Sequence, residues 1–335
     1  MKRVILTAVL AMVFVIVVLL PAWSQRADRP RRVGVLFSGL TLDPAMRPPV
    51  LQALVDGLRE HGWEEGRNVV LEVRYADYLD PARLLELAAE LGAFKVDVIM
   101  VSDTQALDAA RRKAAKIPIV MAGAGVPVSL GFIESLARPG GNITGVVNQT
   151  ETIHEKNLEL LKEISPGMER VGIVHSPENV SSLAALKREK EQMAPRLGLV
   201  VVPLPVSRPA DLDEAFATIV RERVQALLVH GTAQISTRRG RIRIAAFAIE
   251  RRLLTTSGFD FMARDGLLMS YGFDGRVAWR RAASHVDRIF KGANPAELPV
   301  EQLDQFQLII NMKSARAMGL DLPPALVARA DELIE

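Results

Sequence analysis

Short polar segments carry the residues in this sequence that could bind a small molecule. Each follows an apolar run and contains hydroxyl, carboxyl, imidazole or phenol groups, or glycines that let a ligand approach the backbone. The candidate ligand-binding residues in these segments are Ser38, Gly39, Ser102, Asp103, Thr104, Gly125, His175, His230, Thr232 and Tyr271. Asp103 could hold a cation such as an amino group, and Tyr271 could stack on a flat ligand.

Helix caps and turns favour the same residue types, so no single position distinguishes a ligand contact from a cap. The polar segments occur at strand ends in both halves of the chain, however, and open parallel sheets bind ligands at the carboxyl ends of their strands. The pattern as a whole therefore favours a ligand-binding cleft.

The sequence lacks the motifs of the common enzyme and metal sites. There is no cysteine, and the five histidines show no i, i+4 pair; they are His61, His154, His175, His230 and His285. His154 and Glu155 begin like a zinc-protease motif, but Leu158 stands where the second histidine belongs. No nucleophile elbow, phosphate loop or dinucleotide fingerprint is present. We therefore expect no catalytic residue, no metal site and no cofactor, and a protein that is not an enzyme.

The polar segments follow two sets of apolar runs, which we predict to be the strands that position them. The first set comprises Val33–Phe37, Val69–Tyr75, Val96–Val101 and Ile117–Met121. The second set comprises Ile143–Val147, Val171–His175, Val200–Val206, Ala226–His230 and Leu267–Tyr271. Amphipathic helical spacing separates the runs, which indicates parallel sheets covered on both faces. With 335 residues, the chain is predicted to form an α/β protein of two doubly wound parallel-sheet lobes.

The segment SLARPGGNITGV, which begins at Ser135, stands between the two sets. Pro139 would end a helix there, and Gly140 and Gly141 allow backbone angles that other residues avoid. The strand that follows could then leave the first sheet for the second lobe. We predict a hinge at Gly140, Gly141 and Val147, and a plain helix stop remains the alternative.

The N-terminal residues are typical of an exported protein. Lys2 and Arg3 precede an apolar run over 4–20 and a small-residue site that ends at Ser24. We predict a signal peptide over 1–24 that is cleaved after Ser24; an uncleaved anchor is the alternative. Without a cysteine for lipid attachment, the mature chain is expected to be a soluble periplasmic monomer. Its 40 basic and 39 acidic residues give no case for nucleic-acid binding.

Several ordered segments resemble one known family. They are GLREHGWEEGRNVVLEVRYA at 57–76, VDVIMVSDTQAL at 96–107, IPIVMAGAGVPV at 117–128, SLARPGGNITG at 135–145, NLELLKEISPGMERVGIV at 157–174, GLLMSYGFD at 266–274 and the C-terminal stretch from Leu298. The chain resembles the ABC transporter substrate-binding proteins of the type I periplasmic binding fold, in particular the group with tryptophan- and other aromatic-amino-acid-binding members. The resemblance covers nearly all residues from Arg32 to Glu335.

The resemblance implies two lobes joined by three crossing segments. The first lobe would hold 32–148 and about 274–300, and the second about 149–273 and 301–335. Ser38 and Thr104 would lie in the first wall of the cleft, His230, Thr232 and Tyr271 in the second, and Asn148 and Gln149 at the first crossing. Such a protein closes on a small solute and delivers it to an ABC permease in the inner membrane. An exported sensor that presents its solute to a signalling receptor is the alternative.

Three positions depart from the family pattern and bear on the solute. Val126 stands where the family usually has aspartate, and Thr232 replaces the aspartate of a Pro-Asp pair. Asp103 stands where a small residue is usual. The solute is therefore expected to be an amino acid, with an aromatic one among the candidates, or another small carboxylate. In the first case Asp103 would provide the partner of the amino group.

Overall fold

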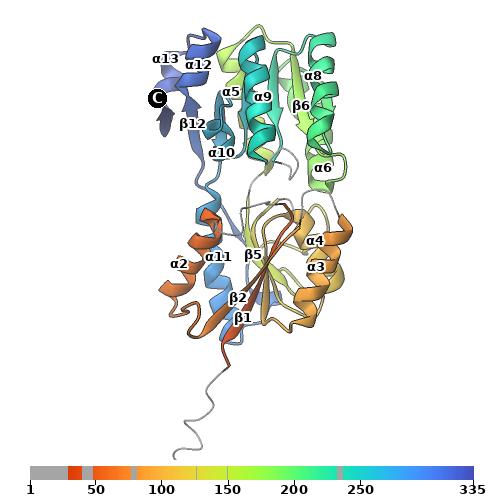
Figure 1. The fold of residues 1–335 in the computed structure, drawn as a ribbon, viewed down its shortest axis with the longest axis vertical. Coiled ribbons are helices and arrows are strands. Elements are labelled where there is room, and N and C mark those ends of the chain that lie inside the picture. The colour runs from red at the N-terminus through yellow and green to blue at the C-terminus, as the bar shows by residue number, and fades with distance from the viewer. Residues whose placement is uncertain (1–28, 40–47, 77–80, 126, 149, 232–236) are drawn as a thin grey trace, which may run out of the picture.

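The computed structural model describes residues 29–39, 48–76, 81–125, 127–148, 150–231 and 237–335. The predicted signal peptide lies outside these residues. Two lobes stand one above the other, and the chain passes between them more than once (Figure 1). Within the described part of the chain, no helix has both the length and the apolar character to cross a membrane.

The first lobe is built on a six-stranded parallel sheet with the order β11-β5-β4-β3-β1-β2. Its strands are β1 (Arg31–Phe37), β2 (Val69–Tyr75), β3 (Val98–Val101), β4 (Ile119–Ala124), β5 (Ile143–Val147) and β11 (Glu301–Gln302). Helices α2 (Pro49–Glu60) and α11 (Gly275–Phe290) cover one face, and α3 (Pro81–Ala93) and α4 (Thr104–Lys113) cover the other. Successive residues of β3 enter opposite cores, which is why its four residues are all apolar.

The second lobe combines a four-stranded parallel sheet, β7-β6-β8-β9, with a three-stranded sheet, β10-β12-β13. The strands are β6 (Arg170–His175), β7 (Val200–Pro205), β8 (Ala226–Val229), β9 (Leu254–Ser257), β10 (Met269–Gly272), β12 (Gln307–Asn311) and β13 (Glu332–Ile334). β12 runs antiparallel to β10 and parallel to β13. The predicted α/β class with parallel sheets in both lobes is confirmed, and the mixed sheet is an addition to it.

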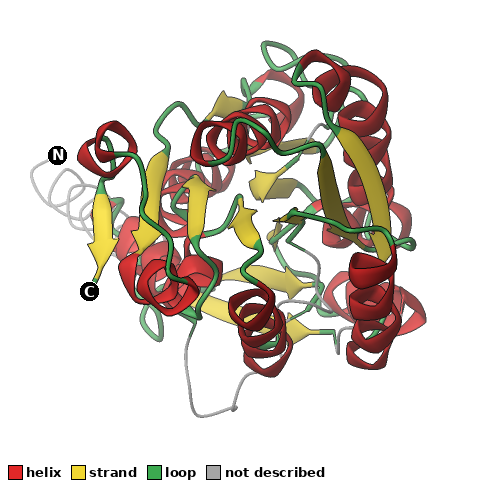
Figure 2. Cartoon of the chain, turned by 90° about the horizontal axis from the view of Figure 1, so that it is seen from above, coloured by secondary structure: helices red, strands yellow, loops and turns green. Residues whose placement is uncertain are grey.

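Helices lie beside the strands of the second lobe, and β13 lies at the margin next to the C-terminus (Figure 2). They are α5 (Thr150–Ile164), α6 (Val180–Arg188), the π-helix η1 (Glu189–Met193), α7 (Ala194–Arg196), α8 (Leu212–Arg221), α9 (Arg238–Arg251), α10 (Asp260–Arg264), α12 (Met312–Met318) and α13 (Pro324–Ala328). Two 3₁₀ turns complete the elements, η2 (Pro209–Asp211) in this lobe and η3 (Pro295–Glu297) beside β5 in the first.

The chain crosses between the lobes after β5, between β10 and α11, and between β11 and β12. We expected the second lobe to resume at 301, but Glu301 and Gln302 pair with Val146 and Val147 in the first sheet. The last crossing therefore follows Gln302. A two-residue strand at the edge of a sheet has too little apolar pattern to be recognised in the sequence.

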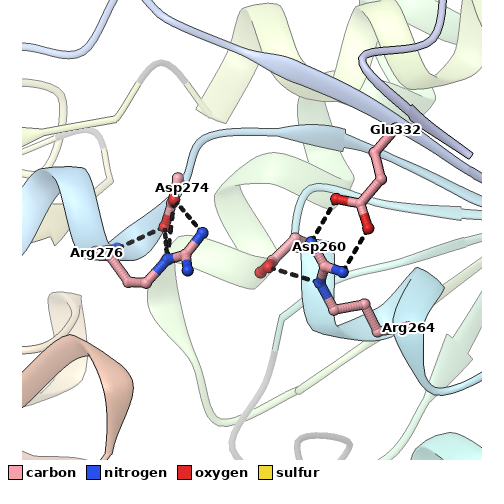
Figure 3. Close-up of polar contacts among 5 residues, drawn as sticks. All are labelled: Asp260, Arg264, Asp274, Arg276 and Glu332. Carbon is pink, nitrogen blue, oxygen red and sulfur yellow. Dashed lines mark hydrogen bonds and ion pairs between the residues drawn. The ribbon is translucent and has the colours of Figure 1, made fainter. Parts of the chain in front are cut away.

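Ion pairs flank the second crossing (Figure 3). Both guanidinium Nη atoms of Arg264 contact the carboxylate of Glu332, at 2.6 and 2.7 Å, and Arg264 Nε lies 3.3 Å from Asp260. The hydrogen bonds from Arg264 lower the pKa of Glu332. Asp274 caps α11 by accepting the backbone N–H of Arg276 at 2.8 Å. A helix cap thus stands at the α11 end of the crossing, and the bidentate ion pair beside it joins α10 to β13.

The predicted hinge glycines lie away from the crossings. The segment before Pro139 is not a helix, because the Ser135 hydroxyl accepts the backbone N–H of Arg138 at 3.0 Å and closes a turn. Gly140 has φ +81°, whereas Gly141 has no positive φ and open space around it. Both precede β5, and that five-residue strand must cross the first sheet before the chain leaves the lobe. The predicted helix end is wrong, and of the three hinge residues only Val147 stands at a crossing.

Candidate solute-binding site between the lobes

A cavity of about 700 Å³ lies between the two lobes. The first lobe lines it with Ser38, Pro81, Leu84, Leu85, Thr104, Gln105, Asp108, Ala109 and Arg112. The second lobe lines it with Glu178, Val180, Ser207, Arg208 and Asp211. The polar residues follow β1, β3, β6 and β7 or lie on the helices that come next, so the cavity sits where the carboxyl ends of both sheets face each other.

Asp103 organises the first wall of the cavity. Its Oδ1 accepts the backbone N–H groups of Gln105 and Ala106 at 2.9 and 3.0 Å, which caps α4. Its Oδ2 accepts the hydroxyls of Ser38 and Ser102, the latter at 2.7 Å. A carboxylate offers about four acceptor sites, and all four are occupied. The expectation that Asp103 receives an amino group of the solute is therefore not supported, because it holds Ser38 and the helix end instead.

One face of α4 points into the cavity. Thr104, Asp108 and Arg112 are spaced at i, i+4 and i+8, and all three line the cavity. Thr104 is buried and donates its hydroxyl to the Gly125 carbonyl at 3.3 Å. Asp108 lies 3.5 Å from Arg112, and both side chains remain partly exposed. The helix therefore offers a hydroxyl, a carboxylate and a guanidinium along one line.

Two loops of the second lobe form the opposite wall. The carboxylate of Asp211 accepts the backbone N–H groups of Ser207 and Arg208 at 2.9 and 3.0 Å and pairs with Arg208 Nε at 3.2 Å. Partial desolvation acts to raise the pKa of Asp211, but these hydrogen bonds outweigh it and the pKa is lowered. Glu178 accepts the hydroxyls of Ser176, at 3.0 Å, and of Ser207. Asp211 thus closes its own loop, and Glu178 joins the two loops through Ser207.

Each lobe therefore presents both signs of charge to the cavity. Arg112 and Arg208 face it from opposite lobes, and their side chains are 57% and 69% exposed, so both can reorient toward a ligand. Apolar surface from Leu84, Leu85 and Val180 lies beside them. This arrangement can bind a molecule that carries an anionic group, a cationic group and an apolar body.

The predicted residues of the first lobe fall at or directly behind this wall. Ser38 and Thr104 line the cavity, and Ser102, Asp103 and Gly125 hold them through hydrogen bonds. Gly39, which follows Ser38, is not among the lining residues. Asn148 donates its side-chain amide to the Gly123 carbonyl at 2.8 Å and so joins the ends of β4 and β5. Val126, Gln149 and Thr232 lie outside the described residues.

Those predicted residues of the second lobe that the structure describes do not line this cavity. His175 and His230 are 5% and 3% exposed and lie inside the lobe. Burial lowers the pKa of His175, and His230 adds to this effect. The ring of Tyr271 packs against Phe306 in the third crossing, with ring centroids 5.8 Å apart. Strand ends can thus be covered by later elements, which the sequence pattern does not reveal.

The charged residues of the cavity were missed by the sequence analysis. Asp108 and Arg112 could have been found from their helical spacing with Thr104. The second-lobe set, Glu178, Ser207, Arg208 and Asp211, carries no comparable signal because it comes from two separate loops. Among the described side chains, one group could hold a metal ion: His154, Glu189 and His230, which lie within the second lobe.

Comparisons with known proteins agree with this architecture. The family model described as ABC transporter substrate binding protein matches residues 43–334. The chain is 22% identical over 297 residues to a tyrosine-binding protein of Clostridioides difficile. The matched region covers 89% of this chain and 84% of that protein.

Solved structures show the same fold. A conserved domain protein from Vibrio cholerae has 24% identity and a TM-score of 0.82, with 91% of this chain and all of that chain covered. An ABC domain from Streptococcus pneumonia in complex with L-Trp has 22% identity and a TM-score of 0.80 at the same coverage. The family model matches most of the chain, and the two-lobed fold with its polar cavity agrees with that match. The chain belongs to the family of ABC transporter substrate-binding proteins.

Proposed function

We propose that this protein is the periplasmic solute-binding component of an ABC importer, and that its solute is an amino acid with an apolar side chain, an aromatic one among the candidates. The observation that carries the proposal is the cavity between the lobes, where each lobe contributes both an arginine and a carboxylate beside apolar residues. A free amino acid carries a carboxylate, an ammonium group and a side chain, and so matches the three kinds of surface.

The geometry divides the binding work between the lobes. Arg112 and Arg208 are the donors suited to the solute carboxylate, since guanidinium groups bind carboxylates through paired hydrogen bonds. Asp108 and Glu178 are the acceptors suited to the ammonium group, one from each lobe. Because each charge of the solute can be held from both sides, binding stabilises the closed arrangement, and no bond is made or broken.

Two relatives support the choice of an amino acid. One is named a tyrosine-binding protein, and another was solved with L-Trp bound. The N-terminal segment with its predicted cleavage after Ser24 supports export, and membership of the family supports delivery to a permease in the inner membrane. The receptor, which we propose to be a monomer, would close on the solute and then pass it to that permease.

Thermal unfolding against a panel of solutes tests the proposal. The panel holds the amino acids, other small carboxylates, sugars and polyamines, and a ligand at 100 times its Kd stabilises the folded state by about 2.7 kcal/mol. We expect the unfolding midpoint to rise with one or more apolar or aromatic amino acids. A rise with only sugars, polyamines or carboxylates without an amino group would refute the amino-acid assignment.

A matched pair of variants then tests the cavity itself. Arg208→Ala removes a lining guanidinium, whereas Arg221→Ala removes an exposed arginine of α8 that does not line the cavity. We expect Arg208→Ala to weaken binding of the identified amino acid about tenfold, and Arg221→Ala to leave it unchanged. Equal affinities for both variants would place the solute elsewhere.

A further inference from the structure

Three titratable side chains from separate segments meet inside the second lobe. His154 comes from α5, Glu189 begins the π-helix η1, and His230 follows β8. Glu189 Oε1 lies 2.5 Å from His154 Nδ1 and 2.8 Å from His230 Nε2. The two imidazole rings are stacked with centroids 4.6 Å apart. None of the three lines the cavity between the lobes, so the solute site does not account for them.

Hydrogen bonding within the group leaves one buried carboxylate oxygen without a partner. Glu189 is fully buried, and its Oε2 has no hydrogen-bond partner among the described residues. A buried carboxylate oxygen without a hydrogen-bond partner is costly in the protein interior, and a bound cation is one way to satisfy it.

The backbone departs from regular helix where Glu189 enters the lobe. α6 ends at Arg188, and Glu189–Met193 forms a π-helix before α7 continues. Such turns are rare and occur frequently at functional sites, because the inserted residue breaks the α-helical hydrogen-bond ladder. Here the irregular turn carries the one carboxylate of the group, so the distortion and the buried carboxylate coincide.

We propose that His154, Glu189 and His230 bind a divalent transition-metal ion of the Zn²⁺ type. Their ligand atoms all lie within 4.8 Å of one another. Two imidazole nitrogens and one carboxylate are a common ligand set for zinc and related ions, with a further position for water. A divalent cation would give the unpartnered Oε2 of Glu189 a positive charge to contact.

A second layer of contacts fits this assignment. The Ser182 hydroxyl lies 3.0 Å from His230 Nδ1. When Nδ1 donates its hydrogen to that hydroxyl, Nε2 carries the free electron pair and faces Glu189, as a metal ligand requires. The ion would join α5, η1 and the end of β8, and α5 is the first helix after the crossing from the first lobe. The site would therefore fix the internal structure of the second lobe without taking part in solute contact.

Metal titration of chelator-treated protein tests the site. Co²⁺ serves as a spectroscopic substitute for Zn²⁺, and we expect one Co²⁺ per chain. His154→Gln and Glu189→Gln should each weaken binding at least about tenfold. His61→Gln is the matched control, because His61 lies in the first lobe with its side chain 35% exposed. Loss of Co²⁺ binding in His61→Gln, or its retention in both site variants, would overturn the proposal.

A measurement on the unaltered protein covers the case in which a variant does not fold. Bound Co²⁺ shifts the nuclear magnetic resonance signals of the histidine rings that ligate it. We expect the ring signals of His154 and His230 to shift strongly, while those of His61 and His285 stay in place. Zn²⁺ should also raise the thermal midpoint of the unaltered protein with no solute present. The absence of stoichiometric Co²⁺ binding, or shifts only at His61, would show that the group is a hydrogen-bonded cluster and not a metal site.

Discussion

Substitution of Asp103 by asparagine separates two interpretations of the cavity wall. If Asp103 receives the amino group of the solute, the variant loses a hydrogen bond between two charged groups. Such bonds are worth about 1.5–3 kcal/mol, which corresponds to a loss of affinity of roughly 10- to 150-fold. The structure leads to the other expectation, because both carboxylate oxygens already accept two hydrogen bonds each. We therefore expect the affinity of Asp103→Asn to change by less than about threefold.

The free energies of unfolding of Asp103→Asn and of a second variant, Asp103→Ala, give the other half of the test. Asparagine caps helices about as well as aspartate, so Asp103→Asn should lose less than about 1 kcal/mol. Asp103→Ala removes the cap of α4 and the acceptor of the Ser38 and Ser102 hydroxyls. A cap is worth about 1 kcal/mol and each of the two hydroxyl bonds to a charged group about 1.5 kcal/mol or more, so we expect a loss of about 4 kcal/mol.

Two assays measure these quantities separately. Titration calorimetry with the amino acid that gives the largest thermal shift reports affinity, with Asp108→Asn as the comparison. Asp108 lines the cavity and is partly exposed, so this comparison variant should lose about three- to tenfold in affinity. Tryptophan fluorescence during urea unfolding reports the first lobe, since Trp63 and Trp279 both lie there. A loss of affinity above tenfold in Asp103→Asn, with Asp108→Asn unchanged, would refute the reasoning.

Two further predictions concern the first lobe. Gly140→Ala should destabilise it by about 1–2 kcal/mol because Gly140 has φ +81°, whereas Gly141→Ala should change its stability by less than about 0.5 kcal/mol; urea unfolding that ranks them equally would contradict this. Burial acts to raise the pKa of Asp287, but hydrogen bonds from Lys291 and Trp63 outweigh it and lower the pKa below 3.8. The stabilisation from Asp287 is therefore complete above about pH 4 and is lost as the pH falls through the lowered pKa. Asp287→Asn should destabilise the lobe at pH 7 and much less near pH 2. An equal loss of stability at both pH values would disprove the stabilising role of the Asp287 carboxylate.

The fold was largely predictable because most strands are buried on both faces. The four residues of β3 are all apolar and fully buried, so the sequence marks them directly. β9 was not among the predicted strands, since two of its four residues are threonines. Both are buried, and their hydroxyls bond to the Leu268 N–H and to Asn157. A strand can therefore be buried in the sheet although its sequence lacks an apolar pattern, because its polar groups form hydrogen bonds in the interior.

The cavity was only half predictable, for a geometric reason. Ser38 and Thr104 follow strands of the first sheet directly, and the rule that ligands bind at strand ends identifies them. Arg208 and Asp211 lie in a loop and 3₁₀ turn of the other lobe, and they face Ser38 only because the lobes are stacked. Contacts that depend on how two lobes meet have no local signature in the sequence.

His230 shows that a strand-end position does not by itself make a residue part of the cleft. It follows β8 directly, as the rule requires, yet α5 and η1 cover it and bring His154 and Glu189 against its ring. A search for histidine motifs by spacing also fails here, because the three residues come from segments far apart in the chain. The same covering that removes His230 from the solute cavity creates the buried group of two imidazoles and a carboxylate. A residue that the sequence pattern places in one site can therefore belong to another, and only the packing of the elements around it decides which.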